Sequence, residues 1–597
     1  MKQNLISLPN KIAHHRFKKV IFDIETEGLE GNTIHCIVAK VIGGETYLFP
    51  PDKLQEGADL IESADVLIGH NIIGFDIPVL KKHFNLNLTN HIEDTLVVSR
   101  LVNPVLTGGH SLENWGYILY PNEADKRKAQ QPDSWENYTE EMGKYCIQDV
   151  ELNADVYYKL LEQVENFSQE SVDLEHSVAK IMKEQEINGF MLDEQKATML
   201  AAKLNSKMAE IEKKVHETFK PKWVDDKIVT PKIRKDGTLS KVGLTNEEMR
   251  KCLRANNFKP FMRQKWVTFN LASRKQIGEY LIDFGWNPER FTPTGQPIVD
   301  EKTLSEVTHI REAKLIADFL LIQKRIAQVD SWVSSVRDDG RVHGFVIPNG
   351  AITGRMTHRN PNMAQVPSVH SPYGKECRSC WVVDEGNVLL GVDASGLELR
   401  MLAHYMNDDK YTNEILNGDI HSANQKSAGL QTRDQAKTFI YAFLYGAGDV
   451  KIGEVAGGGA KRGRHLKKNF LNNTPALKQL REKVSESSGK GWVTGLDGRK
   501  LHIRSQHSAL NTLLQSAGAV IMKKALVLLD SYARQYDLDY KFVLNVHDEF
   551  QCEVRQDQAD FFGGLAVGSI IQAGKSFKLN CPLDGEYKVG ETWQQTH

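Results

Sequence analysis

The architecture of this chain follows most directly from the stretch Gly391-Val392-Asp393-Ala394-Ser395-Gly396-Leu397-Glu398-Leu399-Arg400. It follows the apolar pair Leu389-Leu390, which predicts a buried strand that ends at the carboxylate of Asp393 and turns into a helix. A second stretch, Val543-Leu544-Asn545-Val546-His547-Asp548-Glu549-Phe550, has the same form and ends at Asp548. Two carboxylates at the ends of adjacent strands can hold two Mg²⁺ ions about 4 Å apart, the spacing that two-metal phosphoryl transfer needs.

A helix-forming segment between these strands carries three side chains on one face. Arg433, Lys437 and Tyr441 follow one another at intervals of four, so they share one face of a helix. A forked cation, a point cation and a flat ring complement the triphosphate, sugar and base of a nucleotide. The alternative is a solvated amphipathic helix with its aromatic side chains in the core. The two carboxylate strands favour the nucleotide.

The N-terminal quarter supplies a second acidic group. In Val20-Ile21-Phe22-Asp23-Ile24-Glu25-Thr26, the alternation of a strand turns Asp23 and Glu25 to the same side. Asp76 ends a later apolar segment, and Tyr145 and Asp149 lie four apart on one helix face. Four carboxylates and a phenol can bind two Mg²⁺ ions and position a water against a phosphodiester.

Composition sets wider limits. A chain of 597 residues is expected to hold about three or four domains. The net charge of −2 gives no global nucleic-acid signature, so DNA contacts must depend on local basic patches. No apolar run approaches the roughly 20 residues of a membrane span, and the basic start lacks the apolar core of a secretory signal. Seven scattered cysteines, Cys377 and Cys380 included, favour a reducing compartment and structural roles.

One such basic patch lies between residues 218 and 270. This stretch has 13 Lys/Arg against 5 Asp/Glu, with Trp223 and Trp266 among them. Its proline and glycine punctuation predicts an inserted, partly irregular module. Basic side chains interleaved with aromatic ones suit a phosphate backbone. The alternative is a solvated loop without a partner.

The ordered motifs resemble family A DNA polymerases. The run Asp393 to Arg400 is similar to their motif A, the face with Lys437 to motif B on the fingers helix, and His547-Asp548-Glu549 to motif C. Within that family the chain is most similar, over nearly its whole length, to the replicative polymerases of T-odd podoviruses. The N-terminal acids resemble the proofreading 3′–5′ exonuclease of the DnaQ-like, ribonuclease-H-like fold.

The resemblance implies a multidomain α/β and α+β fold, in which a ribonuclease-H-like exonuclease domain precedes a right-hand polymerase with palm, fingers and thumb. The expected domains are the exonuclease at 1–165, the thumb at 166–340 with a basic insertion at about 218–270, the first part of the palm at 341–412, the fingers at 413–492 and the second part of the palm at 493–597.

The resemblance also implies a role for each site residue. The metal ligands of the polymerase site would be Asp393, the backbone carbonyl of Ala394, and Asp548. In the exonuclease, Asp23, Glu25 and Asp149 would bind metal, Asp76 would support the second ion, and Tyr145 would orient the water. Both sites would use two Mg²⁺ ions, with Mn²⁺ as a substitute.

Substrate contacts are implied in the same way. Arg433 would hold the γ-phosphate, Lys437 the α-phosphate, and His421 would face the triphosphate, with Tyr441 near the base and sugar. Glu398 would exclude a 2′-hydroxyl, unless it is only a salt-bridge partner. Arg355 and Gln515 would probe the minor groove, where every correct pair shows an acceptor in nearly the same place, and His547 would lie near the primer terminus. The alternatives are a surface arginine for Arg355 and a buried polar contact for Gln515.

These inferences predict a phage replicative, template-directed DNA polymerase with an active proofreading exonuclease. Its partners would be primer-template DNA, dNTPs, a thioredoxin-like host processivity factor at 218–270 and a helicase-primase, in the host cytoplasm and with no membrane. The alternatives are a repair polymerase of low processivity, a nuclease whose polymerase half is only a DNA-binding scaffold, and an RNA polymerase or reverse transcriptase. The completeness of Asp393, Lys437 and Asp548 opposes the second, and Glu398 opposes the third.

Overall fold

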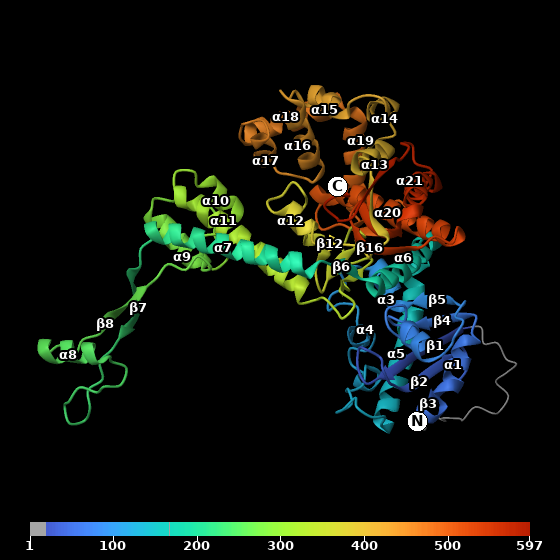
Figure 1. Ribbon diagram of the computed structural model, residues 1–597, viewed down its shortest axis with the longest axis horizontal. Helices are drawn as coiled ribbons and strands as arrows, with labels where there is room; N and C mark the ends of the chain where they lie inside the picture. The colour runs from blue at the N-terminus through green and yellow to red at the C-terminus, as the bar shows by residue number, and fades with distance from the viewer. Residues whose placement is uncertain (1–18, 166) are drawn as a thin grey trace. The chain divides into compact units, whose positions relative to one another are not determined.

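The computed structural model describes residues 19–165 and 167–597, so the expectation about the N-terminal segment lies outside the described residues (Figure 1). The chain folds into two compact units. One contains the described residues up to Asp193 together with Ser335–His597, and the other is Glu194–Ser334.

The first unit begins with a mixed sheet. Among the described residues, its strands lie side by side in the order β3-β2-β1-β4-β5. The central β1 pairs antiparallel with β2 and parallel with β4. Its elements are β1 (Lys19–Thr26), β2 (Ile34–Val41), β3 (Thr46–Phe49), α1 (Leu54–Glu62), β4 (Val66–Gly69), α2 (Asp76–His83), β5 (His91–Asp94), α3 (Thr95–Val102), α4 (Leu112–Leu119) and α5 (Glu140–Val164).

Both faces of this sheet are covered because its strands are apolar on both sides. Phe22 and Ile24 pack with Leu60 of α1, whereas the alternate Ile21 packs against Val150 of α5. The helix α5 therefore lies against the β1 strand that carries the first two acids.

The same unit continues with a second sheet in the order β16-β17-β13-β18. The core behind it includes the long α20 and α21, which pack on each other. The elements preceding and forming this region are α6 (Gln169–Asn188), β6 (Phe190–Leu192), β9 (Arg341–Val342), β10 (Phe345–Ile347), β11 (Thr357–Arg359), α12 (Gly374–Arg378), β12 (Trp381–Val382), β13 (Asn387–Ala394), α13 (Leu397–Met406), β14 (Trp492–Thr494), β15 (Lys500–His502), α20 (Ala509–Gln535), β16 (Tyr540–Val546), β17 (Glu549–Arg555), α21 (Ala559–Ser576) and β18 (Gly585–Gly590).

A helical subdomain lies in the chain between α13 and β14, as the predicted fingers do. It consists of α14 (Asp409–Leu416), α15 (Ile420–Ala428), α16 (Arg433–Leu444), α17 (Asp449–Glu454), α18 (Ala460–Asn473) and α19 (Pro475–Ser488). Thr432 begins α16 with a capping box, in which its hydroxyl accepts from the Gln435 N–H and the Gln435 side chain returns to the Thr432 N–H.

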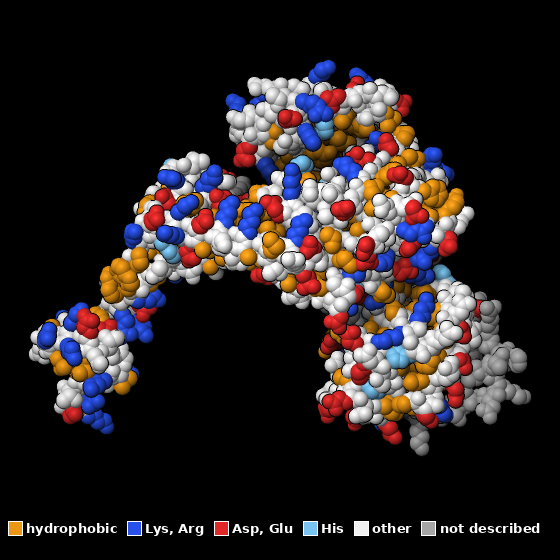
Figure 2. Space-filling view, viewed as in Figure 1, with side chains coloured by type: hydrophobic (Ala, Val, Ile, Leu, Met, Phe, Trp, Pro, Cys, Tyr) orange, Lys and Arg blue, Asp and Glu red, His pale blue; other side chains and the backbone are white. Residues whose placement is uncertain are grey.

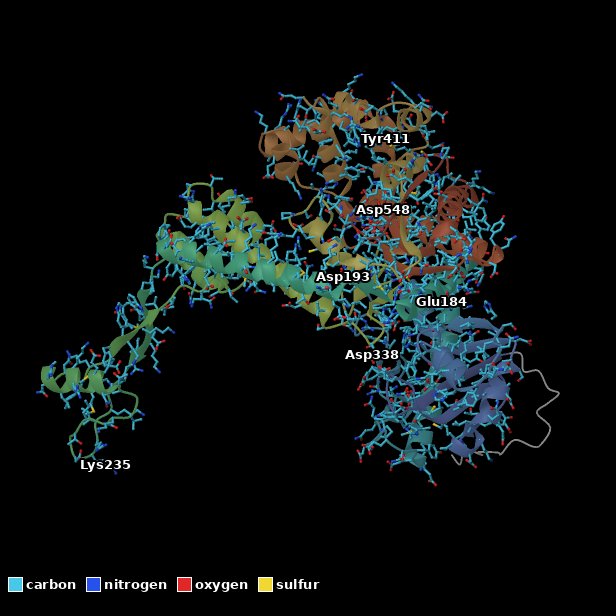
Figure 3. All side chains as sticks on the ribbon, viewed as in Figure 1. Glu184, Asp193, Lys235, Asp338, Tyr411 and Asp548 are labelled. Carbon is cyan, nitrogen blue, oxygen red and sulfur yellow. The ribbon has the colours of Figure 1, made fainter. Side chains whose placement is uncertain are left out.

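The second unit is built on the long helices α7 (Glu194–Thr218) and α11 (Arg311–Val333), which pack together. Between them come β7 (Lys222–Val229), α8 (Asn246–Ala255), β8 (Phe261–Val267), α9 (Arg274–Asp283) and α10 (Glu301–Glu306). The strands β7 and β8 form an antiparallel ribbon, and Lys235 lies on the loop beyond it (Figure 3). This unit falls inside the predicted thumb, whereas α6, at the start of that range, packs on α20 and β16 of the first unit. The predicted domain boundaries remain predictions.

One described helix, Gln506–Gln535, is long and apolar enough to cross a membrane by length and composition. No such run was expected from the sequence. Of its most apolar window, 78% is buried inside the protein, as in a core helix.

Candidate functional site

Two predicted metal carboxylates meet at one edge of the second sheet. Asp393 is next to last in β13, and Asp548 lies in the turn from β16 to β17 (Figure 3). The Ala394 N–H donates to the Asp548 carbonyl oxygen over 3.2 Å, which ties the two strand ends together. His547 adopts a left-handed conformation, with φ of 57°, and allows this tight turn. The strands thus deliver both acids to one place, as predicted.

The electrostatics of this edge favour a bound cation. Burial, followed by the charges of Asp548, Glu549 and Glu586, raises the pKa of Asp393 to about 7. Burial and the neighbouring acids thus disfavour the ionised form of this carboxyl, and a bound cation would offset that cost. Ala394, whose backbone carbonyl is the third predicted ligand, is the next residue in the chain. Oxygen ligands of this kind suit a hard divalent cation.

The α16 face that carries Arg433, Lys437 and Tyr441 forms as predicted, on a helix that runs from Arg433 to Leu444. Lys437 is exposed, and burial together with the carboxylates of Glu398 and Asp548 raises the pKa of Tyr441. The phenol therefore lies within electrostatic reach of Glu398 and Asp548.

Arg433 is held by a residue that the motifs did not single out as a site residue. Its guanidinium donates to both carboxylate oxygens of Asp419, over 2.7 and 3.2 Å. The same carboxylate caps α15 by accepting from the His421 N–H. His421 Nδ1 is buried with no hydrogen-bond partner among the described residues, and burial followed by the charge of Arg433 lowers its pKa. Arg433 and His421 are thus brought together.

Glu398 is anchored by a tyrosine. The Tyr445 hydroxyl lies 2.9 and 2.8 Å from the two carboxylate oxygens, and Arg355 Nη2 lies 3.4 Å from one of them. Glu398 thus forms a salt bridge with Arg355, and its exclusion of a 2′-hydroxyl stays a prediction. Arg355 also lines a small cavity with His547, and Gln515 is half-buried on α20.

A chain of contacts leads from motif C to the C-terminus. Glu549 Oε1 accepts from Trp593 Nε1 over 2.8 Å and lies 2.9 Å from His597 Nε2. Although burial opposes its ionisation, His597 and Arg378 hold the pKa of Glu549 below its usual value. The last residues of the chain therefore pack against this edge of the sheet.

The N-terminal acids also converge. Asp23 and Glu25 lie side by side on β1, and Asp76, at the start of α2, accepts from the Ile24 N–H over 3.1 Å. Tyr145 and Asp149 share one face of α5, and Tyr145 packs edge-on against Trp135. The structure thus gathers all the acids predicted for this site.

The acids of this group are more numerous than their cations. Burial is the largest cause that raises the pKa of each carboxyl, to about 7 for Asp23 and to about 10 for Glu25. The pKa of Asp76 rises well above its usual range, chiefly by burial and then by the charge of Asp23. Asp149 Oδ1 is buried and has no hydrogen-bond partner among the described residues. Crowded carboxylates with an unused oxygen fit divalent cations.

Four residues at these sites were missed by the sequence analysis as site residues: Lys128, Asp419, Tyr445 and His597. Lys128 forms an ion pair with Asp149 and lies over the Tyr145 ring. Each contact joins segments whose pairing no local pattern shows. For Asp419 the sequence did offer a signal. It lies two residues before His421, the predicted triphosphate ligand, and an acid in that position can cap the helix that carries the ligand.

Comparisons with known proteins match both regions of the chain. A family model described as DNA polymerase family A matches residues 241–595, and one described as 3′–5′ exonuclease matches residues 4–165. The DNA-directed DNA polymerases of Enterobacteria phage T3 and Escherichia phage T7 are each 35% identical, over 97% of this chain and 100% of theirs. The polymerase domain of Pol1 from M. smegmatis, in complex with DNA primer-template and dNTP, has a TM-score of 0.77 at 18% identity, over 97% of this chain and 95% of that one.

Proposed function

Because the chain belongs to DNA polymerase family A and is a DNA-directed DNA polymerase with a 3′–5′ exonuclease domain, we propose roles for its individual residues. Both domains belong to families that use divalent metals. We take Mg²⁺ as the ion, with Mn²⁺ as a substitute, since the ligands are carboxylate and carbonyl oxygens.

In the polymerase site Asp393, Asp548 and the Ala394 carbonyl would hold the cations, which would supply charge neutralisation and activation of the primer 3′-hydroxyl. The raised pKa of Asp393 supports this role, because the carboxylate gains most from a neighbouring positive charge. His547 lies beside the primer terminus and Glu549 steadies the turn through Trp593.

The fingers helix orients the nucleotide. Arg433 exchanges the Asp419 carboxylate for the γ-phosphate, because both are anions that a guanidinium binds with two hydrogen bonds. Lys437 neutralises the α-phosphate and gives a proton to the departing pyrophosphate. His421, near the start of α15, donates to the triphosphate beside Arg433 at the start of α16.

Four further residues select the substrate. Glu398, held by Tyr445, occupies the space of a 2′-hydroxyl and rejects ribonucleotides. Tyr441 stacks near the base and sugar and admits dideoxynucleotides. Arg355 and Gln515 contact the minor-groove edge of the nascent pairs and test their geometry without reading sequence.

In the exonuclease site Asp23, Glu25, Asp76 and Asp149 would hold the cations, and Tyr145 orients the attacking water. The buried Asp149 Oδ1, which has no hydrogen-bond partner among the described residues, supports this role because that oxygen can coordinate a cation. The positive charge of Lys128 counteracts the rise in the pKa of Asp149 that burial causes, and its ammonium lies over the Tyr145 ring. All predicted acids are present and gathered, so we propose that proofreading is active.

The observation that carries the proposal is the meeting of Asp393 and Asp548 at linked strand ends. A 5′-labelled primer on a longer template tests it, with Mg²⁺, with and without dNTPs. We expect extension with dNTPs and shortening without them, and neither after chelation of the metal. Shortening under both conditions would support a nuclease with a scaffold polymerase half. Extension without any shortening would mean a silent exonuclease.

The insertion at 218–270 would bind a thioredoxin-like host processivity factor. Large apolar side chains stay exposed on it (Figure 2). They include Trp223, which is 61% exposed, and Trp266, which is 55% exposed, and the two rings pack edge to face. A two-stranded ribbon with little core of its own gains from a partner that covers such side chains. If added thioredoxin lengthens the products that the chain makes in one binding event, the proposal is supported. Products of equal length with and without thioredoxin would refute it.

We also propose that the chain replicates phage DNA in the host cytoplasm, in company with a helicase-primase. The similarity over the full length of the phage T3 and T7 polymerases supports the replicative role. Extension through duplex DNA that depends on an added helicase-primase would test it. A chain that only fills short gaps would instead be a repair polymerase.

A further inference from the structure

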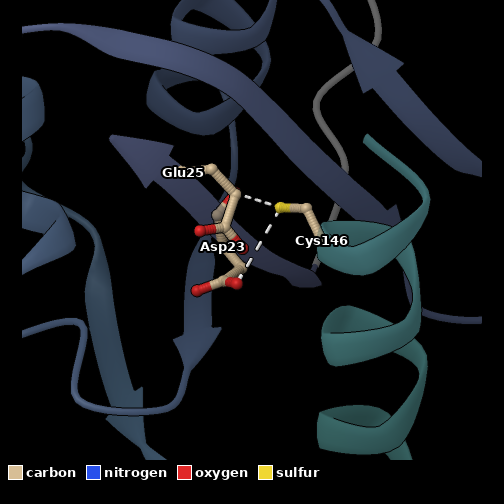
Figure 4. Close-up of side chains that lie close together, drawn as sticks. All are labelled: Asp23, Glu25 and Cys146. Carbon is tan, nitrogen blue, oxygen red and sulfur yellow. Dashed lines mark hydrogen bonds between the residues drawn. The ribbon is translucent and has the colours of Figure 1, made fainter. Parts of the chain in front are cut away.

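One lysine lies among the acids of the exonuclease site. Asp23 and Glu25 lie on β1 beside α5, whose Cys146 contacts Asp23 (Figure 4). The Lys128 ammonium forms an ion pair with Asp149 of α5, and its positive charge also opposes the rise in the pKa of Asp23 and of Glu25. Among the described residues, this is the ion pair that reaches the acids of the site.

The same ammonium covers the phenol of the site. Lys128 Nζ lies 4.8 Å from the centre of the Tyr145 ring, and the indole of Trp135 packs edge-on against that ring, with the ring centroids 5.8 Å apart. Tyr145 and Asp149 lie one helical turn apart on α5. Lys128 therefore contacts both the side chain that is proposed to orient the attacking water and one of those proposed to hold the cations.

The segment that carries Lys128 is fixed by the same helix. Gln148 of α5 donates from Nε2 to the backbone oxygens of Asp125 and Arg127, over 3.1 and 3.0 Å. Arg127 Nε in turn donates to the Tyr120 backbone oxygen over 2.7 Å. The backbone that leads into Lys128 is thus held on α5, whereas the lysine side chain is 24% exposed and so remains open to a substrate.

We propose that Lys128 is a catalytic residue of primer shortening, and that its ammonium contacts a non-bridging oxygen of the scissile phosphate. That phosphate has to lie between the water that Tyr145 orients and the cations that the acids hold, and the ammonium lies beside both groups. Lys128 exchanges the Asp149 carboxylate for the phosphate, because an ammonium forms charge-assisted hydrogen bonds with either anion. This role rests on the proposed function of the acids.

The charge of Lys128 acts while the bonds exchange. The water oxygen forms a bond to phosphorus, and the bond from phosphorus to the 3′-oxygen of the preceding nucleotide breaks. That 3′-oxygen leaves with the electron pair and takes a proton from solvent, and the attacking water releases a proton to solvent. The products are a nucleoside 5′-monophosphate and a primer one nucleotide shorter. Negative charge grows on the non-bridging oxygens in the transition state, and Lys128 stabilises it while keeping its own proton.

The test is single-turnover shortening of a 5′-labelled single-stranded oligonucleotide by the full chain at saturating Mg²⁺. Lys128→Ala should lower the rate by about 10²-fold. Its affinity for the oligonucleotide, measured by anisotropy without divalent metal, should stay almost unchanged. Lys128→Arg keeps the charge and should retain more of the rate, and added ethylamine should restore part of the rate to Lys128→Ala.

The matched control is Lys126→Ala, because Lys126 lies two residues away, is exposed and pairs with Glu123. This variant should shorten the oligonucleotide at the wild-type rate. Extension of a primer with dNTPs should persist in every variant, which reports that each chain is folded.

A wild-type rate in Lys128→Ala overturns the inference. If that rate is reached at less Mg²⁺, the lysine only stands where a cation binds. A loss confined to oligonucleotide binding, or a loss that neither arginine nor ethylamine reduces, overturns it as well. Each of these results leaves the exonuclease assignment intact, because the wild type still shortens the oligonucleotide. A wild type that never shortens it overturns that assignment, and this inference with it.

Discussion

Replacing two neighbours of Asp393 should shift its pKa in opposite directions. Glu586 and Lys588 lie on β18, where Glu586 is the register partner of Asp393 and Lys588 that of Gly391. After burial, the negative charge of Glu586 is among the causes that raise the pKa of Asp393 to about 7, whereas Lys588 lowers it. Removing Glu586's charge makes protonated Asp393 less favourable, so the pKa falls. Removing the positive charge of Lys588 makes the pKa of Asp393 rise.

The size of the shift follows from the strand register. Side chains of directly opposed residues bring their charged ends to roughly 6 Å. At that distance, through water-like surroundings, one unit charge shifts a pKa by about 0.5 unit. Lys588 is two register pairs away, on the same face of the sheet, so its removal should shift the pKa by roughly half as much and upwards.

The assay is the initial rate of primer extension against pH, with the metal held below half-saturation. Protons and the divalent cation then compete for the Asp393 carboxylate, and the rate falls as the pH drops through its pKa. Glu586→Gln should move this acid limb to lower pH and Lys588→Gln to higher pH. Glu591→Gln, an exposed acid just beyond β18, serves as the control. Shifts in the same direction, or an equal shift for the control, would refute the reasoning.

Three further outcomes are expected. Lys523→Met should destabilise the fold by about 3–5 kcal/mol, since it leaves the fully buried Glu175 with one cation fewer. Thermal unfolding should show a melting temperature lower by several degrees. Lys524→Met, at the half-buried neighbouring lysine, should leave it almost unchanged. Glu398→Ala should raise ribonucleotide incorporation about tenfold or more, whereas Glu398→Gln keeps the bulk and the discrimination; equal behaviour of the two would remove the steric role. Lys437→Ala should lower the single-turnover rate by about 10²–10³-fold, with primer binding by anisotropy unchanged; a loss confined to primer binding would contradict the phosphate role.

The parts of the sites that could be predicted from sequence are those set by local spacing. A strand alternates its faces, so Asp23 and Glu25 had to lie together, and a helix repeats every three to four residues, so Tyr145 and Asp149 did too. The same holds for Arg433, Lys437 and Tyr441. The apolar runs before Asp393 and Asp548 predicted the strands that end at these residues. That these strands are neighbours came from the family resemblance and not from any local pattern.

The contacts that escaped prediction join distant segments. Lys128 lies in an irregular segment before α5, and no periodicity directs it to Asp149. His597 reaches Glu549 because Trp593 anchors the chain end, a tertiary effect. Such pairings depend on packing, which the order of residue types alone does not show.

The most direct test of the central claim, one chain with two separate active sites, is a comparison of Asp393→Asn with Asp23→Asn on the same 5′-labelled primer-template. Asp393→Asn should abolish extension with dNTPs and still shorten the primer without them. Asp23→Asn should extend normally and no longer shorten. If either substitution abolished both activities in a chain that melts like the wild type, or if neither lost any activity, the assignment of these carboxylates would be wrong.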